Sequence, residues 1–176
     1  MTKKLTELIK ASGFGDIACF DPSQLVARPE VREMCAADKC NAFGKSWSCP
    51  PACGSLESYQ EMFARYRMGY LFQTVTVMED PFDYASIERG SAEHKRRFDD
   101  LAKRVSLSKR DILLLGAGTC TLCETCTYPS APCRYPERAF PSMEAAGLVV
   151  YDVCALTDMP CHHGPNTIAF CSCALE

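Results

Sequence analysis

The spacing of apolar residues predicts helices in three parts of the chain. Apolar side chains within residues 5–9 recur at steps of three and four, which places them on one face of a short opening helix. Ser55 is a residue type that caps helices, and a helical apolar pattern follows it to about Arg67. The most regular pattern spans residues 86–105, where the charged side chains fall away from the apolar positions. That segment predicts a long amphipathic helix with a solvated charged face.

Short apolar runs between these segments predict strands. They cover residues 17–20, 70–77, 111–115, 148–153 and 167–170. A further capped helix is expected to begin near Ser142, with Glu144 in its first turn. Helices and strands alternate irregularly, without an internal repeat. We therefore expect one small domain, residues 1–176, of α/β or α+β class, with a mixed sheet and packed helices.

Two long segments interrupt every periodic pattern and are rich in cysteine. They cover residues 35–54, which we call the first loop, and residues 116–136, which we call the second loop. Glycine and proline residues, among them Pro50 and Pro51, break up both segments. Loops of this length in a small domain are usually functional or held by something other than a ladder of hydrogen bonds. Bound metal would hold them.

Composition and charge narrow the classes of function. Apolar residues make up 47% of the 176-residue chain and charged residues 23%, which is ordinary for a folded protein. The formal net charge of −3 excludes the basic excess expected of a nucleic-acid-binding or membrane-surface protein. No segment is long and apolar enough for a membrane span, and no apolar segment follows Lys3 and Lys4 as in a secretion signal. We expect a cytoplasmic protein, in which the 13 cysteines stay reduced and the clustered ones bind metal.

The second loop has the cysteine spacing of a ferredoxin-type site. Cys120, Cys123 and Cys126 are each separated by two residues, and Cys133 follows them. Three thiolates at this spacing wrap around one face of a [4Fe-4S] cubane, and the more distant cysteine supplies the fourth ligand. The alternative is a four-thiolate zinc site, although zinc modules usually bring two separate Cys-x-x-Cys pairs.

The first loop carries a less regular group, Cys35, Cys40, Cys49 and Cys53. Pro50 directly follows Cys49, as prolines do in ferredoxin loops. If Cys53 is a ligand, four thiolates close a second [4Fe-4S] cluster, which then suits single-electron transfer. If Cys53 is not a ligand, one position stays open for a substrate atom. Both alternatives remain open.

Four motifs together resemble a prokaryotic family of predicted metal-binding proteins, domain of unknown function 2284. They are residues 40–51 (CNAFGKSWSCPP), the cysteine triple at 120–126, residues 133–137 (CRYPE) and residues 141–147 (PSMEAAG). The resemblance covers the chain from about Cys35 to Val153 and implies metal binding without implying a reaction. The family pattern has three cysteines in the first group, so Cys53 is an addition in this chain.

The leading hypothesis is an iron–sulfur protein with two [4Fe-4S] clusters. It acts either in electron transfer or as a small reductase whose substrate reaches the Cys35, Cys40 and Cys49 cluster; whether it is an enzyme stays open. Two oxidised clusters of about −2 each would take the formal charge from −3 to about −7, so a redox partner protein should present a basic patch. The alternatives are a non-redox zinc module with a structural or regulatory role, and a protein that handles a metal or a corrinoid-related cofactor.

A second tier of candidates lies near the C-terminus. Cys154 and the run Cys161, His162 and His163 could ligate a metal or form a surface turn beside buried structural cysteines. Cys171 and Cys173 would share one face of a strand, as a redox pair or a ligand pair, unless the terminus is frayed. His94, on the apolar face of the long helix, is expected to be a packed, hydrogen-bonded histidine. Nothing in the sequence indicates an oligomeric state.

Overall fold

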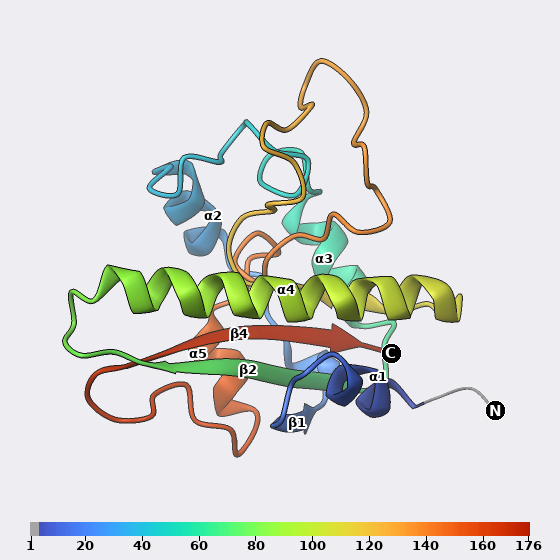
Figure 1. Cartoon of the computed structure of the whole chain (residues 1–176). Helices are drawn as coiled ribbons and strands as arrows, with labels where there is room; N and C mark the ends of the chain where they lie inside the picture. Colours follow the sequence, from blue (N-terminus) through green and yellow to red (C-terminus); the bar gives the residue numbers. More distant parts are fainter. Residues whose placement is uncertain (1–3) are drawn as a thin grey trace.

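A four-stranded antiparallel sheet lies at the centre of the molecule (Figure 1). The computed structural model describes residues 4–176. The strands stand in the order β1-β2-β4-β3, with bounds Ile17–Phe20 for β1, Gly69–Val77 for β2, Leu113–Leu115 for β3 and Thr167–Leu175 for β4. Strands β2 and β4 pair along their whole length, from Gly69 opposite Leu175 to Val77 opposite Thr167. This long pair is the frame on which the helices pack.

Helices cover both faces of the sheet. They are α1 (Leu5–Ala11), α2 (Pro29–Ala36), α3 (Leu56–Phe63), α4 (Tyr84–Ser108) and α5 (Val150–Ala155), with a short 3-10 turn, η1, at Pro22–Gln24. One hydrophobic cluster packs α1 and α4 against one face, around Phe72 and Leu114. The other packs α3 and α5 against the opposite face, around Leu71 and Cys173. The three predicted helices α1, α3 and α4 are confirmed, and Ser55 caps α3 by accepting a hydrogen bond from the Ser58 amide.

The fold class is confirmed in its α+β form. Every ladder of the sheet is antiparallel, and parallel pairing among residues 4–176 is limited to one bridge, Gly116 with Ser142. The sheet is therefore antiparallel, where a mixed sheet was expected. The Gly116 amide donates to the Pro141 carbonyl at 2.8 Å, and the Met143 amide donates to the Gly116 carbonyl at 3.0 Å. These bonds close the neck of the second loop.

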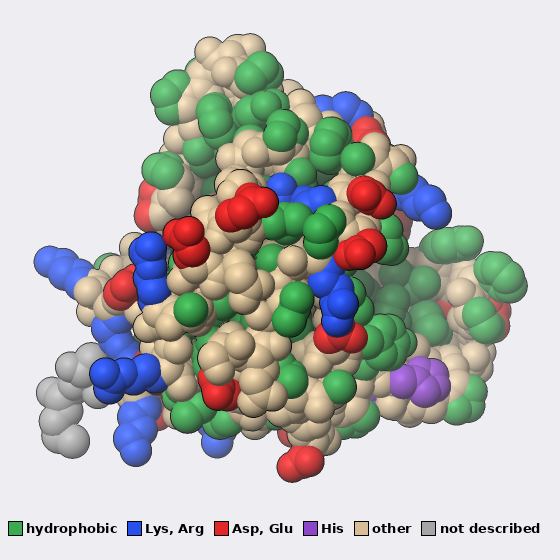
Figure 2. All heavy atoms as spheres, turned by 180° about the vertical axis from the view of Figure 1, so that it is seen from behind, with side chains coloured by type: hydrophobic (Ala, Val, Ile, Leu, Met, Phe, Trp, Pro, Cys, Tyr) green, Lys and Arg blue, Asp and Glu red, His purple; other side chains and the backbone are tan. Residues whose placement is uncertain are grey.

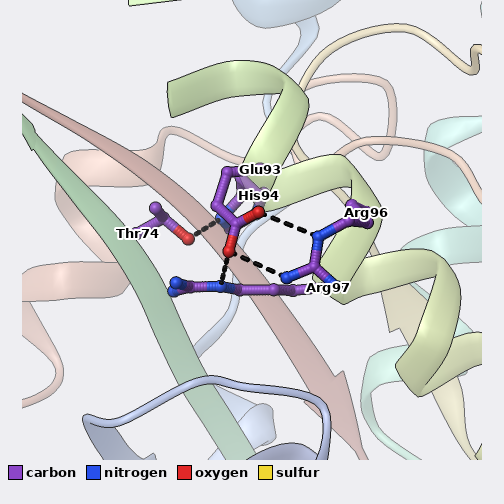
Figure 3. Close-up of polar contacts among 5 residues, drawn as sticks. All are labelled: Thr74, Glu93, His94, Arg96 and Arg97. Carbon is purple, nitrogen blue, oxygen red and sulfur yellow. Dashed lines mark hydrogen bonds and ion pairs between the residues drawn. The ribbon is translucent and has the colours of Figure 1, made fainter. Parts of the chain in front are cut away.

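His94 anchors α4 to the two central strands. Its Nδ1 lies 3.0 Å from the hydroxyl of Thr74 on β2, and its Nε2 lies 2.7 Å from the hydroxyl of Ser172 on β4. Glu93, next to it, pairs instead with Arg96 and Arg97 on the solvent side of the helix (Figure 3). The side chain of His94 is 1% exposed. The expectation of a packed, hydrogen-bonded histidine is confirmed.

The helix predicted at Ser142 is a single turn. Ser142 does cap it, since its hydroxyl accepts a hydrogen bond from the Ala145 amide at 3.0 Å. Gly147 then adopts φ +83, and the Gly147 and Leu148 amides donate back to Glu144 and Met143. This is the Schellman pattern that ends helices. This terminating pattern follows the Ser142 cap by only one turn, so no longer helix forms.

The strand predicted at residues 148–153 is wrong, because α5 occupies that segment. Its valines favour a strand by propensity, but the burial pattern is helical: Tyr151 and Asp152 are exposed while Val153 and Cys154 are buried. Tertiary packing against the sheet overrides the local preference.

The C-terminal segment is a central strand instead of a frayed end. Strand β4 continues to Leu175, and the backbone of Glu176 pairs with Arg67 and Met68. Cys171 and Cys173 lie on the same buried face, as expected for residues two apart on a strand.

No helix within residues 4–176 is long and apolar enough to cross a membrane. Residues 1–3, which include Lys3 of the expected non-secretory start, lie outside the described residues.

Candidate metal centre

Three cysteines of the first loop meet at one cavity. Cys35 comes from the last turn of α2, which the sequence did not predict, and Cys40 and Cys49 come from the loop that follows. The cavity has a volume of about 250 Å³. Its remaining walls are Phe43, Pro50, Gly118, Thr119, Ser142, Glu144 and Ala145. The structure thus brings three of the four predicted ligands of this group together.

Cys53 lies beside this cavity but not in its wall. Its Sγ is 3.6 Å from Nη2 of Arg32 and 3.7 Å from the carbonyl oxygen of Ala145. Burial raises the pKa of the Cys53 thiol, and the Arg32 guanidinium opposes that rise. A cation on α2 is therefore the direct neighbour of this sulfur.

Burial disfavours the thiolate forms of two cysteines in the first cavity. Burial raises the pKa of Cys35 and raises that of Cys49 to about 11. Glu144 is one of the lining residues, and its carboxylate oxygen Oε2 is buried without a hydrogen-bond partner among residues 4–176. A buried polar atom of this kind in a native structure calls for an explanation, such as a group that binds there.

The four cysteines of the second loop share one small pocket. Cys120, Cys123, Cys126 and Cys133 line it, and residues 46–48 of the first loop form part of its wall. Burial raises the pKa of Cys120. Burial acts in the same direction on Cys126, but hydrogen bonds from backbone amides and a hydroxyl together lower the pKa of that thiol. The donors include the backbone of Trp47 and the hydroxyl of Ser46.

Trp47 joins the two loops directly. Its indole Nε1 donates to the carbonyl of Ala131 at 3.1 Å, and its ring meets Tyr128 edge-on with centroids 4.9 Å apart. The loops therefore lie side by side above the sheet, as Figure 1 shows. Hydrophobic side chains gather over this end of the molecule (Figure 2).

The two cysteine sites adjoin one another. Ser48 lines the second site while its neighbour Cys49 lines the first. Thr119 lines the first site while its neighbour Cys120 lines the second. Neighbouring Cα atoms are about 3.8 Å apart. Two chain segments thus form a common wall between the sites.

A larger cavity of about 680 Å³ lies on the other side of Cys120, between α4 and the second loop. Phe98, Phe140 and Lys95 are among its lining residues. Burial lowers the pKa of Lys95, and nearby Cys120 opposes that shift. This cavity gives access to the second site from solvent.

A third set of sulfurs lies on the opposite side of the sheet from α4. Cys154, Cys161 and Cys171 have sulfur atoms that all lie within 4.8 Å of one another. Cys154 and Cys161 form a disulfide. The expectation that the cysteines stay reduced therefore fails at this pair, because α5 and the loop after it fold back and bring the two thiols together. His162 is exposed, and His163 contacts Gln73, not a cysteine.

Within residues 4–176, this third set is the only group of three potential metal ligands packed so closely. No three sulfurs of the first or second group come within 4.8 Å of one another. Zinc–sulfur bonds of about 2.3 Å place the thiolates of a tetrahedral zinc site about 3.8 Å apart. A cubane holds its irons at separate corners, so its thiolates lie further apart.

Several residues of these sites escaped the sequence reasoning. Pro29 in the first turn of α2 was a usable start signal for the helix that carries Cys35. Glu144 was noted only as a helix-start residue, and the serines at 46 and 48 carried no signal at all.

Comparison with known proteins gives one match. The family model described as "Predicted metal-binding protein (DUF2284)" matches residues 18–175. No curated protein and no solved structure matches the chain.

Proposed function

Because the chain belongs to the DUF2284 family of predicted metal-binding proteins, we propose that it binds two [4Fe-4S] clusters and works as a redox protein. Cys120, Cys123, Cys126 and Cys133 would hold one cluster. Cys35, Cys40 and Cys49 would hold the other. Bound there, the clusters would take up and release single electrons.

The observation that carries this proposal is the common wall between the two sites. Ser48 and Cys49, and likewise Thr119 and Cys120, are sequence neighbours that face different sites. Electron transfer from one cluster to another requires the two clusters to lie close together, and adjoining sites meet that requirement. The adjoining arrangement therefore supports a relay from one site to the other.

The residues fit such groups in their chemistry. The second site offers four thiols, and the donors around Cys126 favour its thiolate form. Hydrogen bonds to cluster sulfurs are one of the means by which a protein sets reduction potential. The first site offers three thiols, and Glu144 is among its lining residues.

We further propose that the first site is the one that meets a substrate. Three cysteines line its cavity, and Cys53 lies at its edge, where its sulfur contacts Arg32 and the carbonyl of Ala145, which is part of the cavity wall. Glu144 and Ser142 also line this cavity, and the Cys35 sulfur lies 4.0 Å from the backbone carbonyl oxygen of Glu144. Polar atoms beside the three cysteines can bind a donor group of a small molecule.

Elemental analysis of anaerobically purified protein tests the cluster assignment. The parent should contain about eight irons and eight acid-labile sulfides per chain, since each [4Fe-4S] core has four of each. Cys126→Ser and Cys49→Ser should each lose about half of the iron. Cys19→Ser, which changes an exposed thiol outside all three groups, should lose none. A colourless parent with stoichiometric zinc and no sulfide would overturn the proposal in favour of a zinc module.

The variant Cys53→Ser tests the substrate assignment separately. We expect it to keep the parent's iron content, and the electron paramagnetic resonance of the first cluster should respond to cyanide or a small thiol in both proteins. The substrate assignment would be wrong if Cys53→Ser lost about half of the iron and the parent spectrum did not change with cyanide or a small thiol. The first cluster would then have four cysteine ligands and serve electron transfer alone.

A redox partner protein remains part of the proposal. Two bound clusters would make the molecule strongly anionic, so the partner should present a basic patch, and the rate of reduction should fall as salt is added.

A further inference from the structure

We propose that Cys154, Cys161 and Cys171 form a third metal site, which takes one thiolate-preferring ion such as Zn²⁺ when the Cys154–Cys161 disulfide is reduced. This inference stands on its own geometry and does not depend on clusters in the other two groups. The sulfur of Cys171 lies within 4.8 Å of both sulfurs of the disulfide, so reduction would leave three thiols close enough to converge on a single ion.

The three cysteines come from separate elements that the fold fixes in place. Cys154 is on α5, Cys171 is on β4, and Cys161 is on the loop between them. Cys154 and Cys171 are each 5% exposed, and Cys161 is half-buried. A site with two ligands on rigid elements and one on a loop can admit an ion through movement of that loop alone.

The disulfide decides when the site is available. While Cys154 and Cys161 are bonded to each other, Cys171 is the only one of these three residues with a free thiol. A trialkylphosphine and one water molecule convert the disulfide into two thiols and a phosphine oxide. Three thiols then bind one Zn²⁺ and release three protons, which leaves a net charge of −1 on the site. A water molecule would take the fourth position, as in zinc sites with three protein ligands.

Gln73 is placed to stabilise that negative charge. In the disulfide state its Oε1 lies 3.8 Å from the Cys171 sulfur, and its Nε2 lies 2.9 Å from Nε2 of His163. Turning the amide by half a turn would let Nε2 donate to a Cys171 thiolate and let Oε1 accept from His163. The side chain of Gln73 is 6% exposed and lies beside a cavity of about 730 Å³, so solvent reaches it.

Zinc uptake by the full chain with its native metal content tests the proposal. Oxidised and phosphine-reduced protein are incubated with Zn²⁺, freed of unbound metal and analysed for zinc and iron. Reduced protein should gain about one zinc per chain over oxidised protein, with unchanged iron. Zinc should also protect the three cysteines from alkylation, as mapped by mass spectrometry.

Matched variants make the result specific. Cys161→Ser, on the loop, should weaken zinc binding at least tenfold, since even outer-shell changes cost about that much. Cys171→Ser should do the same, and Cys19→Ser, a thiol beside the same cavity, should bind as the parent does. Circular dichroism checks that each variant is folded. The proposal is overturned if reduction adds no zinc, or if folded Cys161→Ser binds zinc as tightly as Cys19→Ser.

Discussion

Acid should weaken the fold through one residue, His94. Burial lowers the pKa of His94 from 6.5 to about 4, and the nearby positive charges of Arg97 and Lys95 add to the effect. The ring is held neutral between Thr74 and Ser172. A second proton would place a charge in the core, and the adjacent Glu93 pairs with Arg96 and Arg97 instead, so the folded state resists protonation.

The size of the effect follows from the two pKa values. Because the pKa is lower in the folded state, the unfolded chain binds a proton first as the pH falls below 6.5. The stability that neutral His94 provides is complete above that value and is lost progressively toward pH 4. At about 1.4 kcal/mol per pKa unit, the full loss is about 3 kcal/mol, and about 2 kcal/mol is lost between pH 7 and pH 5.

Urea unfolding of the parent and of His94→Gln, followed by circular dichroism under argon, measures it. The variant keeps a polar side chain that can reach both hydroxyls but does not titrate. Its free energy of unfolding should be lower at pH 7, and the gap to the parent should close by about 2 kcal/mol at pH 5. Acid effects on metal sites are common to both proteins and cancel in the difference. A gap that is the same at both pH values would refute the reasoning.

Three further changes should be informative. A Gly→Ala change normally stabilises a helix, but in Gly90→Ala the new methyl group would overlap the hydroxyl of Thr76 on β2. Thermal unfolding should therefore show a free energy of unfolding lower by about 1–3 kcal/mol. A stabilised variant would contradict the packing of α4 on the sheet. Ser55→Ala removes the cap of α3 and should cost about 1 kcal/mol in urea unfolding, with Ser55→Asp as the control that restores it. Trp47→Phe removes the hydrogen bond to Ala131 but keeps an aromatic ring; amide exchange in the second loop should become roughly fivefold faster, in line with about 1 kcal/mol, while exchange in β4 stays unchanged.

The sequence predicted those parts of the fold in which local pattern and tertiary packing agree. The helix at 86–105 and the strand at 70–77 are present because their apolar residues meet the sheet or form it. The strand predicted at residues 148–153 is absent because a short apolar run rich in valine is compatible both with pairing at a sheet edge and with packing on a sheet face. The helix predicted from Ser142 is only a single turn because Gly147 ends it, and the positive φ of Gly147 is visible only in the structure.

The candidate sites were predictable as groups but not as neighbours. Cysteine spacing assigned Cys120 and Cys35 to separate groups, and the structure keeps that division. Spacing carries no information on contacts between loops about 70 residues apart, so the common wall and the role of Trp47 could not be foreseen. The grouping of Cys154 with Cys161 and Cys171 likewise depends on how α5 packs on β4.

The common wall between the first and second sites has a consequence for how the molecule matures. Residues 46–49 and 118–120 cannot settle around one occupant without also shaping the walls of the other site. Filling either site should therefore lower the entropy cost of ordering the other site. By reciprocity, the coupling free energy is the same whichever site fills first. During maturation of the parent protein, chains with only one site filled would then be fewer than independent filling of the two sites would give.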